Sequence, residues 1–187
     1  MIFHHRGGMK MSKHTWAVDV AHSSIDFSVK HMMVSRVKGT FHDFDVVLEA
    51  DPYDLTTATI ELTVDLATVD TRINKRDDHL RSEDFFYIDE YPKAIFKATD
   101  IKKTDNDEYD VTGELTIRGT TVTETFSVTF EGEATDPEGK EIVGFSGDGQ
   151  INRADYGLTY NAALESGGVV VGDNIKISFE FEAAKVE

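Results

Sequence analysis

The feature that most constrains this chain is a strict alternation of apolar and polar residues. Between residues 60 and 66 (IELTVDL) every second side chain is apolar, and the residues between them are polar. Similar runs occur near residues 25–29, 109–117, 126–130 and 175–181. A period of two places all the apolar side chains on one face of an extended strand, whereas an amphipathic helix needs apolar residues at i, i+3 and i+4. The pattern therefore predicts half-buried antiparallel strands.

Turn residues separate these runs at short intervals. Residues 105–107 (DND) and 119–120 (GT) each divide two runs, and 136–139 (DPEG) is typical of a type I turn with proline at its second position. The apolar parity changes between Phe41 and Phe44, which a β-bulge near 42–43 would explain. About eight strands are expected, the number at which a closed barrel holds one small ligand.

One segment, residues 74–86 (NKRDDHLRSEDFF), lacks alternation and carries the chemistry of a helix start. Asn74 is expected to cap the first turn, with Asp77 and Asp78 near the positive end of the helix. Ser82 is expected to cap a second short turn. The sequence thus predicts an all-β antiparallel barrel with one short helical insertion near residues 74–86.

Length and composition fit one large domain. The chain has 187 residues, 40% of them hydrophobic, with no repeat or linker, so we expect a flexible leader over 1–14 and a single domain over 15–187. The first twelve residues contain no apolar run of the length that a signal peptide requires. No stretch approaches the length of a transmembrane helix. These observations predict a cytoplasmic location.

Charge and cysteine content exclude several classes of function. The formal net charge is −16, which repels nucleic acid and anionic bilayers at long range and disfavours both as partners. The chain has no cysteine, which excludes disulfides, thiolate catalysis and cysteine-based zinc sites.

His31 is the histidine of most interest. It shares the odd parity of Ile25, Phe27 and Val29, so a continued strand would point it toward the apolar side. Two interpretations remain open: a hydrogen-bonded core histidine at the end of a strand, or a polar group at the mouth of a cavity.

Two basic islands stand out in this acidic chain. Residues 27–42 contain three cations and no carboxylate, and residues 72–81 contain four cations against Asp77 and Asp78. The islands could converge on an anionic head group. Alternatively, Asp77 and Arg81 pair at i, i+4 and the other cations are solvated.

Signatures of catalysis are missing from the sequence. There is no G-x-S-x-G motif, and Ser166-Gly167-Gly168 leads into a valine run rather than a helix that could receive a phosphate. We therefore expect no enzyme activity, no metal and no cofactor.

Four segments resemble the YceI family of bacterial lipid-binding proteins. They are 22–31 (HSSIDFSVKH) with 37–41 (VKGTF), 70–86 (DTRINKRDDHLRSEDFF) with Tyr91, Pro92 and Phe96, 113–119 (GELTIRG), and 153–157 (RADYG). The resemblance runs from about residue 16 to residue 183. It implies a lipocalin-like antiparallel barrel with a long apolar cavity for polyisoprenoids, isoprenoid quinones or related lipids. This chain departs from many members in lacking a signal peptide, and it has Tyr156 where phenylalanine is usual.

Together these observations predict a soluble carrier that holds one long-chain isoprenoid, of the polyprenyl phosphate or isoprenoid quinone type, inside the barrel. The expected contacts with the ligand tail are Phe27, Val29, Leu62, Val64, Ile117, Phe126, Ile177 and Phe179. The expected contacts with the head group are His31, Arg72 and Arg76. Two alternatives are an enzyme acting on a bound lipid with His31 as acid or base, and an acidic stress or interaction protein without a lipid. The protein could also form a homodimer through a sheet edge or an open face, although no feature of the sequence selects this.

Overall fold

The fold is an antiparallel β-barrel with one α-helix, described by a computed structural model over residues 13–161 and 170–186. In chain order the elements are β1 (His14–Val18), η1 (Val20–His22), β2 (Ser24–His31), β3 (Ser35–Phe41), β4 (Phe44–Asp51), β5 (Asp54–Asp65), η2 (Leu66–Thr68), β6 (Val69–Asp70), α2 (Asn74–Arg81), β7 (Lys93–Asp105), β8 (Glu108–Ile117), β9 (Thr120–Thr135), β10 (Glu141–Asn152), η3 (Arg153–Tyr156) and β11 (Val171–Lys185). Most of the expected leader, residues 1–12, lies outside the described residues, and His14 already belongs to β1.

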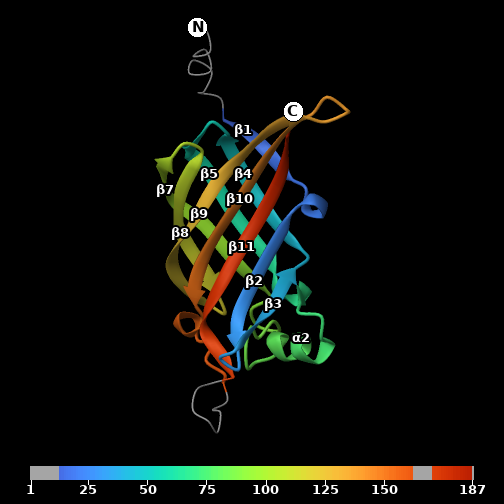
Figure 1. Cartoon of the computed structure of the whole chain (residues 1–187), viewed down its shortest axis with the longest axis vertical. Helices are drawn as coiled ribbons and strands as arrows, with labels where there is room; N and C mark the ends of the chain where they lie inside the picture. Colours follow the sequence, from blue (N-terminus) through green and yellow to red (C-terminus); the bar gives the residue numbers. More distant parts are fainter. Residues whose placement is uncertain (1–12, 162–169, 187) are drawn as a thin grey trace.

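Eight strands close the barrel in the order β1-β4-β5-β7-β8-β9-β10-β11, and β11 pairs back with β1 (Figure 1). Every pairing is antiparallel, and short hairpins connect four of the neighbouring pairs: β4–β5, β7–β8, β8–β9 and β9–β10. The all-β prediction, the count of about eight strands and the helical insertion are therefore confirmed.

One strand position of the barrel is divided between two segments. β1 pairs with the end of β11 around Ala183, and β2 pairs with its earlier part, from Glu180 back to Val171. The short turn η1 separates β1 from β2, and Asp19 accepts the Ala21 amide at its start. The chain therefore leaves the barrel wall briefly and rejoins it along the same neighbouring strand.

β2, the second of the two segments at this strand position, continues into a hairpin with β3. β2 pairs with β3 along its length, and β3 meets β6 only at Thr40 and Phe41. The change of parity at 42–43, which the sequence analysis attributes to a bulge, is instead a break between two strands, because β3 and β4 have different partners. The Asp43 amide donates to Thr68 Oγ1 at this break, over 3.1 Å.

The barrel end at which β1 begins and β11 ends is filled with side chains. Trp16, Leu55, Tyr109 and Val143 are at most 4% exposed there, and they belong to one hydrophobic core. The indole Nε1 of Trp16 donates to the Ala50 carbonyl over 3.0 Å, so this buried polar group is satisfied. This end is closed by packing alone.

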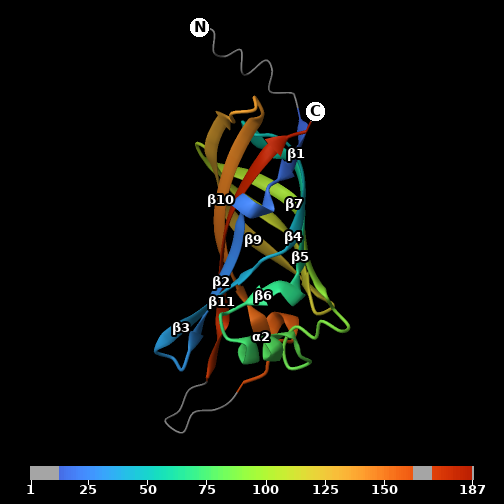
Figure 2. The ribbon, with the colours of Figure 1, turned by 90° about the vertical axis from the view of Figure 1, so that its right-hand side faces the viewer.

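The opposite end is covered by α2 and the turns that follow it, as Figure 2 shows. The helix begins after Ile73, which makes no side-chain cap, so the expected capping by Asn74 is wrong. Asp77 is buried and turns back toward the strand before the helix, and Arg81 pairs with Asp78 over 2.8 Å instead of with Asp77. Within the described residues, no helix has the length and apolarity needed to cross a bilayer.

Candidate functional site

An apolar cavity of about 250 Å³ lies inside the barrel, and the surface of its wall is apolar throughout. An engineered apolar cavity of about 150 Å³ stays dry and binds benzene, so a space of this kind favours an apolar ligand over water. The eight residues expected to contact a ligand tail all belong to its wall: Phe27, Val29, Leu62, Val64, Ile117, Phe126, Ile177 and Phe179. That they contact a ligand remains a prediction.

The alternation of each strand explains why these side chains point inward. Leu62 and Val64 lie on β5, opposite Phe96 and Ala94 of β7, and all four line the cavity. Their polar neighbours, such as Thr63, point outward because successive side chains of a strand alternate between faces. The closed barrel therefore gathers the apolar face of every strand around one axis.

Four phenylalanine rings of the cavity wall lie against inward-facing glycines of neighbouring strands. A Cβ added at any of these glycines would come within 3.0 Å of the ring. The pairs are Phe27 with Gly39, Phe96 with Gly113, Phe126 with Gly149, and Phe179 with Gly147. Each ring thus occupies space that a second side chain would otherwise take, and lies along the wall instead of filling the centre of the barrel.

These glycines were not among the predicted site residues, although the sequence contains a signal for them. A glycine within a strand weakens the strand and often marks the close approach of another group. Gly147 and Gly149 share one parity in β10, as do the buried Phe145 and Ile151. Two glycines on the buried face of one strand therefore indicate space reserved for large neighbours.

Replacing Gly149 by alanine is expected to displace the Phe126 ring toward the cavity. The nearest atoms around an added Cβ all belong to that ring, so the ring must move. We expect a loss of about 1–3 kcal/mol in the free energy of unfolding, measured by urea denaturation, together with weaker uptake of an apolar ligand. Gly144→Ala in the same strand is the control, because its Cβ would make only ordinary contacts, the nearest at 3.8 Å. Equal behaviour of the two variants would contradict this account of the wall.

Side chains from beyond the barrel strands close the cavity at the end covered by α2. Leu80 of α2, Phe85 and Phe86 in the following turns, and Leu158 after η3 all line it. Phe85 packs edge-on against His79 and Tyr160, with ring centroids 5.0 and 5.4 Å away. The segment 70–86, which resembles the YceI family, therefore covers this end of the cavity through Leu80, Phe85 and Phe86.

Arg153 holds this end together from inside. Its side chain is 3% exposed and donates to the carbonyls of Leu158 (2.5 Å), Tyr160 (2.9 Å), Gly172 (2.8 Å) and Val171 (3.3 Å). Burial lowers the pKa of the guanidinium, because the charged form is poorly solvated there. The carbonyl dipoles replace the lost water, and they tie the segment after η3 to the start of β11.

Tyr156, at the position where the family usually has phenylalanine, is fully buried. Its hydroxyl donates to Glu124 Oε2 over 2.6 Å, and burial, followed by the nearby Glu124 carboxylate, raises the pKa of the phenol. Tyr156 is not among the residues of the cavity wall. The added hydroxyl therefore serves a hydrogen bond to β9 instead of a polar site for the ligand.

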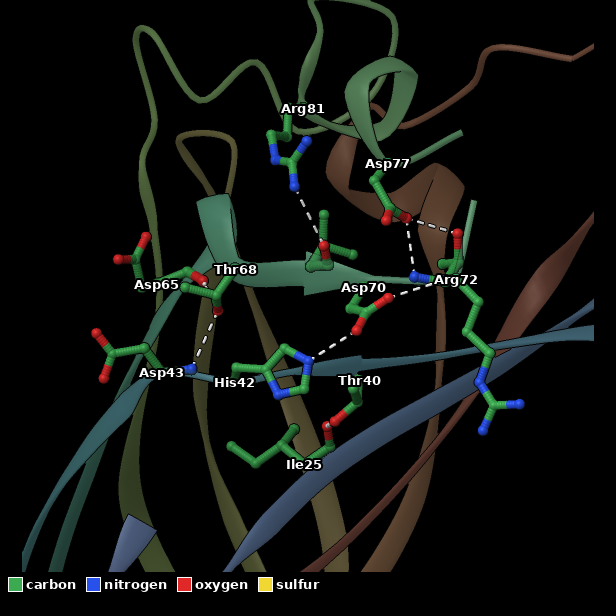
Figure 3. A network of polar contacts seen from close by, with 12 residues as sticks. Ile25, Thr40, His42, Asp43, Asp65, Thr68, Asp70, Arg72, Asp77 and Arg81 are labelled. Atoms are coloured by element: carbon green, nitrogen blue, oxygen red, sulfur yellow. Dashed lines mark hydrogen bonds and ion pairs between the residues drawn. The ribbon is translucent and has the colours of Figure 1, made fainter. Parts of the chain in front are cut away.

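A polar network joins β6 to α2 below the barrel (Figure 3). Asp77 Oδ1 accepts hydrogen bonds from the Thr71 amide (2.8 Å) and hydroxyl (2.6 Å), and Arg76 Nε donates to the same hydroxyl (2.8 Å). Asp70 Oδ1 accepts the Arg72 amide over 2.8 Å, which holds Arg72 at a positive φ of 73°. The guanidinium of Arg72 extends away from this network, as Figure 3 shows.

The three residues expected at the head group meet in a second, open hollow lined mostly by polar residues. His31, Arg72 and Arg76 line it together with Arg36 and Lys38, so the two basic islands converge. His31 is not among the residues that line the apolar cavity, although it shares the parity of Ile25, Phe27 and Val29. His31 is the last residue of β2 and pairs with Val171 of β11, beyond a shift of register between Val171 and Ile175 that interrupts the regular alternation.

One cluster of possible metal ligands occurs among the described residues, outside the cavity wall. Asp19, His22 and Glu182 place their ligand atoms within 4.8 Å of one another beside η1. His22 Nδ1 lies 2.7 Å from Asp19 Oδ2, and this hydrogen bond raises the pKa of His22 and lowers that of Asp19. The group is largely solvent-exposed, so a solvated ion pair accounts for it.

The fold and cavity define a class: antiparallel barrels that enclose an apolar chamber. The sequence pattern of the YceI-like domain matches residues 16–183, and the chain belongs to this family. A UPF0312 protein of Staphylococcus epidermidis is 45% identical over 167 residues, which cover 89% of this chain and 92% of that protein. A UPF0312 protein of Staphylococcus aureus is 43% identical over the same share of each chain.

Solved structures share the fold. BcnA of Burkholderia cenocepacia is 27% identical with a TM-score of 0.77, covering 88% of this chain and 98% of that one. The YceI protein of Campylobacter jejuni is 34% identical with a TM-score of 0.73, covering 84% and 90%. A domain of Saccharophagus degradans described as polyisoprenoid-binding is 15% identical with a TM-score of 0.69, covering 92% and 99%, which shows likeness of fold alone.

Proposed function

We propose that this protein binds one long-chain isoprenoid, with its tail in the apolar cavity and its head group toward the basic hollow. The observation that carries the proposal is the cavity of about 250 Å³ with an apolar wall inside a closed barrel. A protein that needed only a stable core would gain free energy by filling this space, because lost packing contacts destabilise a core. An enclosed apolar space is well suited to a ligand that is itself apolar and slender.

The energetics favour a chain-like ligand. Removing apolar surface from water contributes about 25 cal/mol per Å², so a tail that buries several hundred Å² gains several kcal/mol. Ordering the flexible chain and desolvating its head group offset part of this gain. Affinity should therefore rise with chain length until the cavity is full.

Likeness of fold supports the isoprenoid class. The Saccharophagus degradans domain of the same fold is described as binding polyisoprenoids. This chain presents an apolar chamber in the same kind of barrel. A linear isoprenoid combines an apolar tail with a compact polar head, which matches an apolar chamber with a basic hollow close to it, since Phe27 and Ile177 line both.

The basic hollow favours an anionic head group over a neutral quinone ring. Its lining holds five cations (Arg36, Lys38, Arg72, Arg76 and Lys176) against three carboxylates (Asp26, Asp70 and Asp148), so positive charge is in excess, and guanidinium groups bind phosphate through paired hydrogen bonds. Arg76 donates two hydrogen bonds to Thr71, whereas the Arg72 guanidinium extends away from the polar network (Figure 3). We therefore assign the first contact with a phosphate to Arg72 and a supporting charge to His31 and Arg76.

A direct test extracts the purified protein with organic solvent and identifies the extracted lipid by mass spectrometry. A stoichiometric prenyl lipid is the expected result. An empty extract, together with no binding in a titration with prenyl phosphates of increasing length, would favour an acidic interaction protein without a lipid. A chemically altered lipid recovered after incubation would favour an enzyme, a function that the position of His31 outside the cavity wall does not support.

Arg72→Ala is expected to weaken binding of a prenyl phosphate by about tenfold while leaving the matching prenol unaffected. The physical reason is that the substitution removes a charged donor from the hollow and touches nothing in the cavity wall. Isothermal titration with both ligands measures the difference. Lys102→Ala, an exposed cation on β7, is the control. If Arg72→Ala weakens both ligands equally, the head group does not lie beside Arg72.

A further inference from the structure

The tip of the β2–β3 hairpin exposes three consecutive apolar side chains. Met32, Met33 and Val34 are 41%, 48% and 86% exposed. The other large apolar side chains exposed within residues 13–161 and 170–186 occur singly along the sequence. Scattered exposed apolar residues are ordinary, whereas a contiguous group indicates a surface that contacts something else.

The backbone at this tip is unfavourable for the residues that occupy it. Met32 and Met33 have φ values of 57° and 64°, and the Val34 amide donates to the His31 carbonyl over 3.2 Å. Two positive φ values in a hairpin turn favour Asn-Gly, and unbranched bulky side chains there are uncommon. The turn therefore keeps two methionines at a stability cost, which suggests that their side chains have a use.

Cations gather on one face of the same hairpin. The pairings Lys30↔Arg36 and Ser28↔Lys38 in β2–β3, and Ser28↔Lys176 between β2 and β11, place four cations side by side. No carboxylate occurs within residues 27–42; the nearest acids are Asp26 and Asp148, which lie on the side of the cations away from the tip, and Asp173 along β11. Surface charges farther away than about 8–10 Å are screened at physiological salt, so the net charge of −16 does not decide what this face attracts.

The hairpin extends from the cavity wall to the tip without interruption. Val29 of β2 and Phe41 of β3 line the cavity, and β2 continues from Val29 to the turn at Met32. A strand rises about 3.3 Å per residue, so Met32 lies roughly 10 Å along β2 from Val29. Figures 1 and 2 show the hairpin projecting at the barrel end that α2 covers.

From these observations we infer that the β2–β3 tip docks on an anionic lipid bilayer, with Met32, Met33 and Val34 in the interface and the four cations on the head groups. Apolar side chains beside basic residues bind such surfaces through both effects together. A role in loading the cavity from the membrane rests on the proposed function. Docking itself does not depend on it.

Vesicle co-sedimentation tests the inference with the full chain. Vesicles of phosphatidylglycerol mixed with phosphatidylcholine should carry the protein into the pellet, less so at high salt, and pure phosphatidylcholine vesicles should carry down far less. The variant Met32→Asn, Met33→Gly, Val34→Ser removes the apolar tip and supplies the turn residues that positive φ favours. It should melt at the same or a higher temperature, while its partition onto anionic vesicles falls at least about tenfold.

A second variant tests the charges. Lys30→Glu with Lys38→Glu should weaken partition at least about tenfold, because each juxtamembrane cation contributes to attraction. Lys102→Glu with Lys103→Glu on β7 changes the net charge equally and should have little effect. The control for the tip variant described above is Val47→Ser, which removes an exposed apolar side chain from β4 and should leave partition onto vesicles unchanged.

A fluorescent probe locates the contact. The natural chain has no cysteine, so Met33→Cys and Glu138→Cys each accept one environment-sensitive dye. Only the dye at residue 33 should shift to the blue when anionic vesicles are added. Several outcomes would overturn the inference: no sedimentation of the parent, a tip variant that sediments like the parent, or a dimer that depends on the tip and forms without vesicles.

Prenyl binding in vesicle-free solution separates this inference from the proposed function. Tip variants should bind a short prenyl phosphate as the parent does, because they leave the cavity wall intact. A parent that docks on vesicles but takes up no prenyl lipid would contradict the proposed function and leave docking in place.

Discussion

Val64→Trp is expected to lower the affinity for a long prenyl chain at least about tenfold while the free energy of unfolding changes by less than about 1.5 kcal/mol. Val64 is 7% exposed and points into the cavity from β5, between Phe44 and Ala94 on the neighbouring strands. An indole there can enter the open space of about 250 Å³ that the tail would occupy. A lipid titration and a urea denaturation curve measure the two quantities.

The matched control for this experiment is Val47→Trp. Val47 is 47% exposed on β4, so the same exchange adds the indole outside the barrel and should leave lipid binding unchanged. If the space inside the barrel were too small for an indole, Val64→Trp would overpack the core and destabilise the protein by about 1–3 kcal/mol or more. Marked destabilisation together with undetectable lipid binding by the parent would therefore contradict the carrier function.

Arg153→Met should cost about 3–5 kcal/mol in the free energy of unfolding and lower the melting temperature by roughly 6–20 °C. The substitution leaves four carbonyls without the donor that they share, in a place from which water is largely excluded. Arg153→Lys should recover little of the loss, since one ammonium cannot reach carbonyls that a planar guanidinium spans. Thermal and urea denaturation measure both variants.

Arg72→Met is the comparison for the buried arginine. Arg72 is exposed, and its guanidinium extends away from its neighbours in Figure 3, so the loss should be within about 0.5 kcal/mol. A similar loss in the two methionine variants would show that carbonyl satisfaction is not the reason for the effect at Arg153.

The middle of the barrel was predictable from the sequence because one physical rule governs it. Leu62, Val64, Ile177 and Phe179 lie on long strands where parity alone decides which face is buried. The alternation identified all eight residues that were predicted to line the cavity, and all eight lie in its wall. About eight strands with this alternation are sufficient to close a barrel around one small ligand.

The ends of the barrel were harder to predict, because tertiary closure decides them. His31 has the parity of an inward residue and still pairs with Val171 of β11, but the register between the two strands shifts between Val171 and Ile175, so parity alone no longer assigns its face. Leu80 and Phe85 face the cavity from a helix and a turn, where no period of two exists. Pairing of Asp77 with Arg81 along the helix was one of two alternatives, whereas Asp77 accepts two hydrogen bonds from Thr71, a contact that depends on how the chain folds back.

The pairing of phenylalanine rings with glycines gives this barrel a simple way to change the width of its cavity. Strand number and tilt fix the backbone radius of a barrel, and changing them requires a new topology. At Gly149, by contrast, the atoms nearest to an added Cβ all belong to the Phe126 ring, so one substitution moves one ring. Related proteins could therefore acquire bores for thinner or thicker molecules through single codon changes, while the hydrogen-bonded framework stays the same. A comparison of these positions among relatives with known cargo would show whether evolution has used this route.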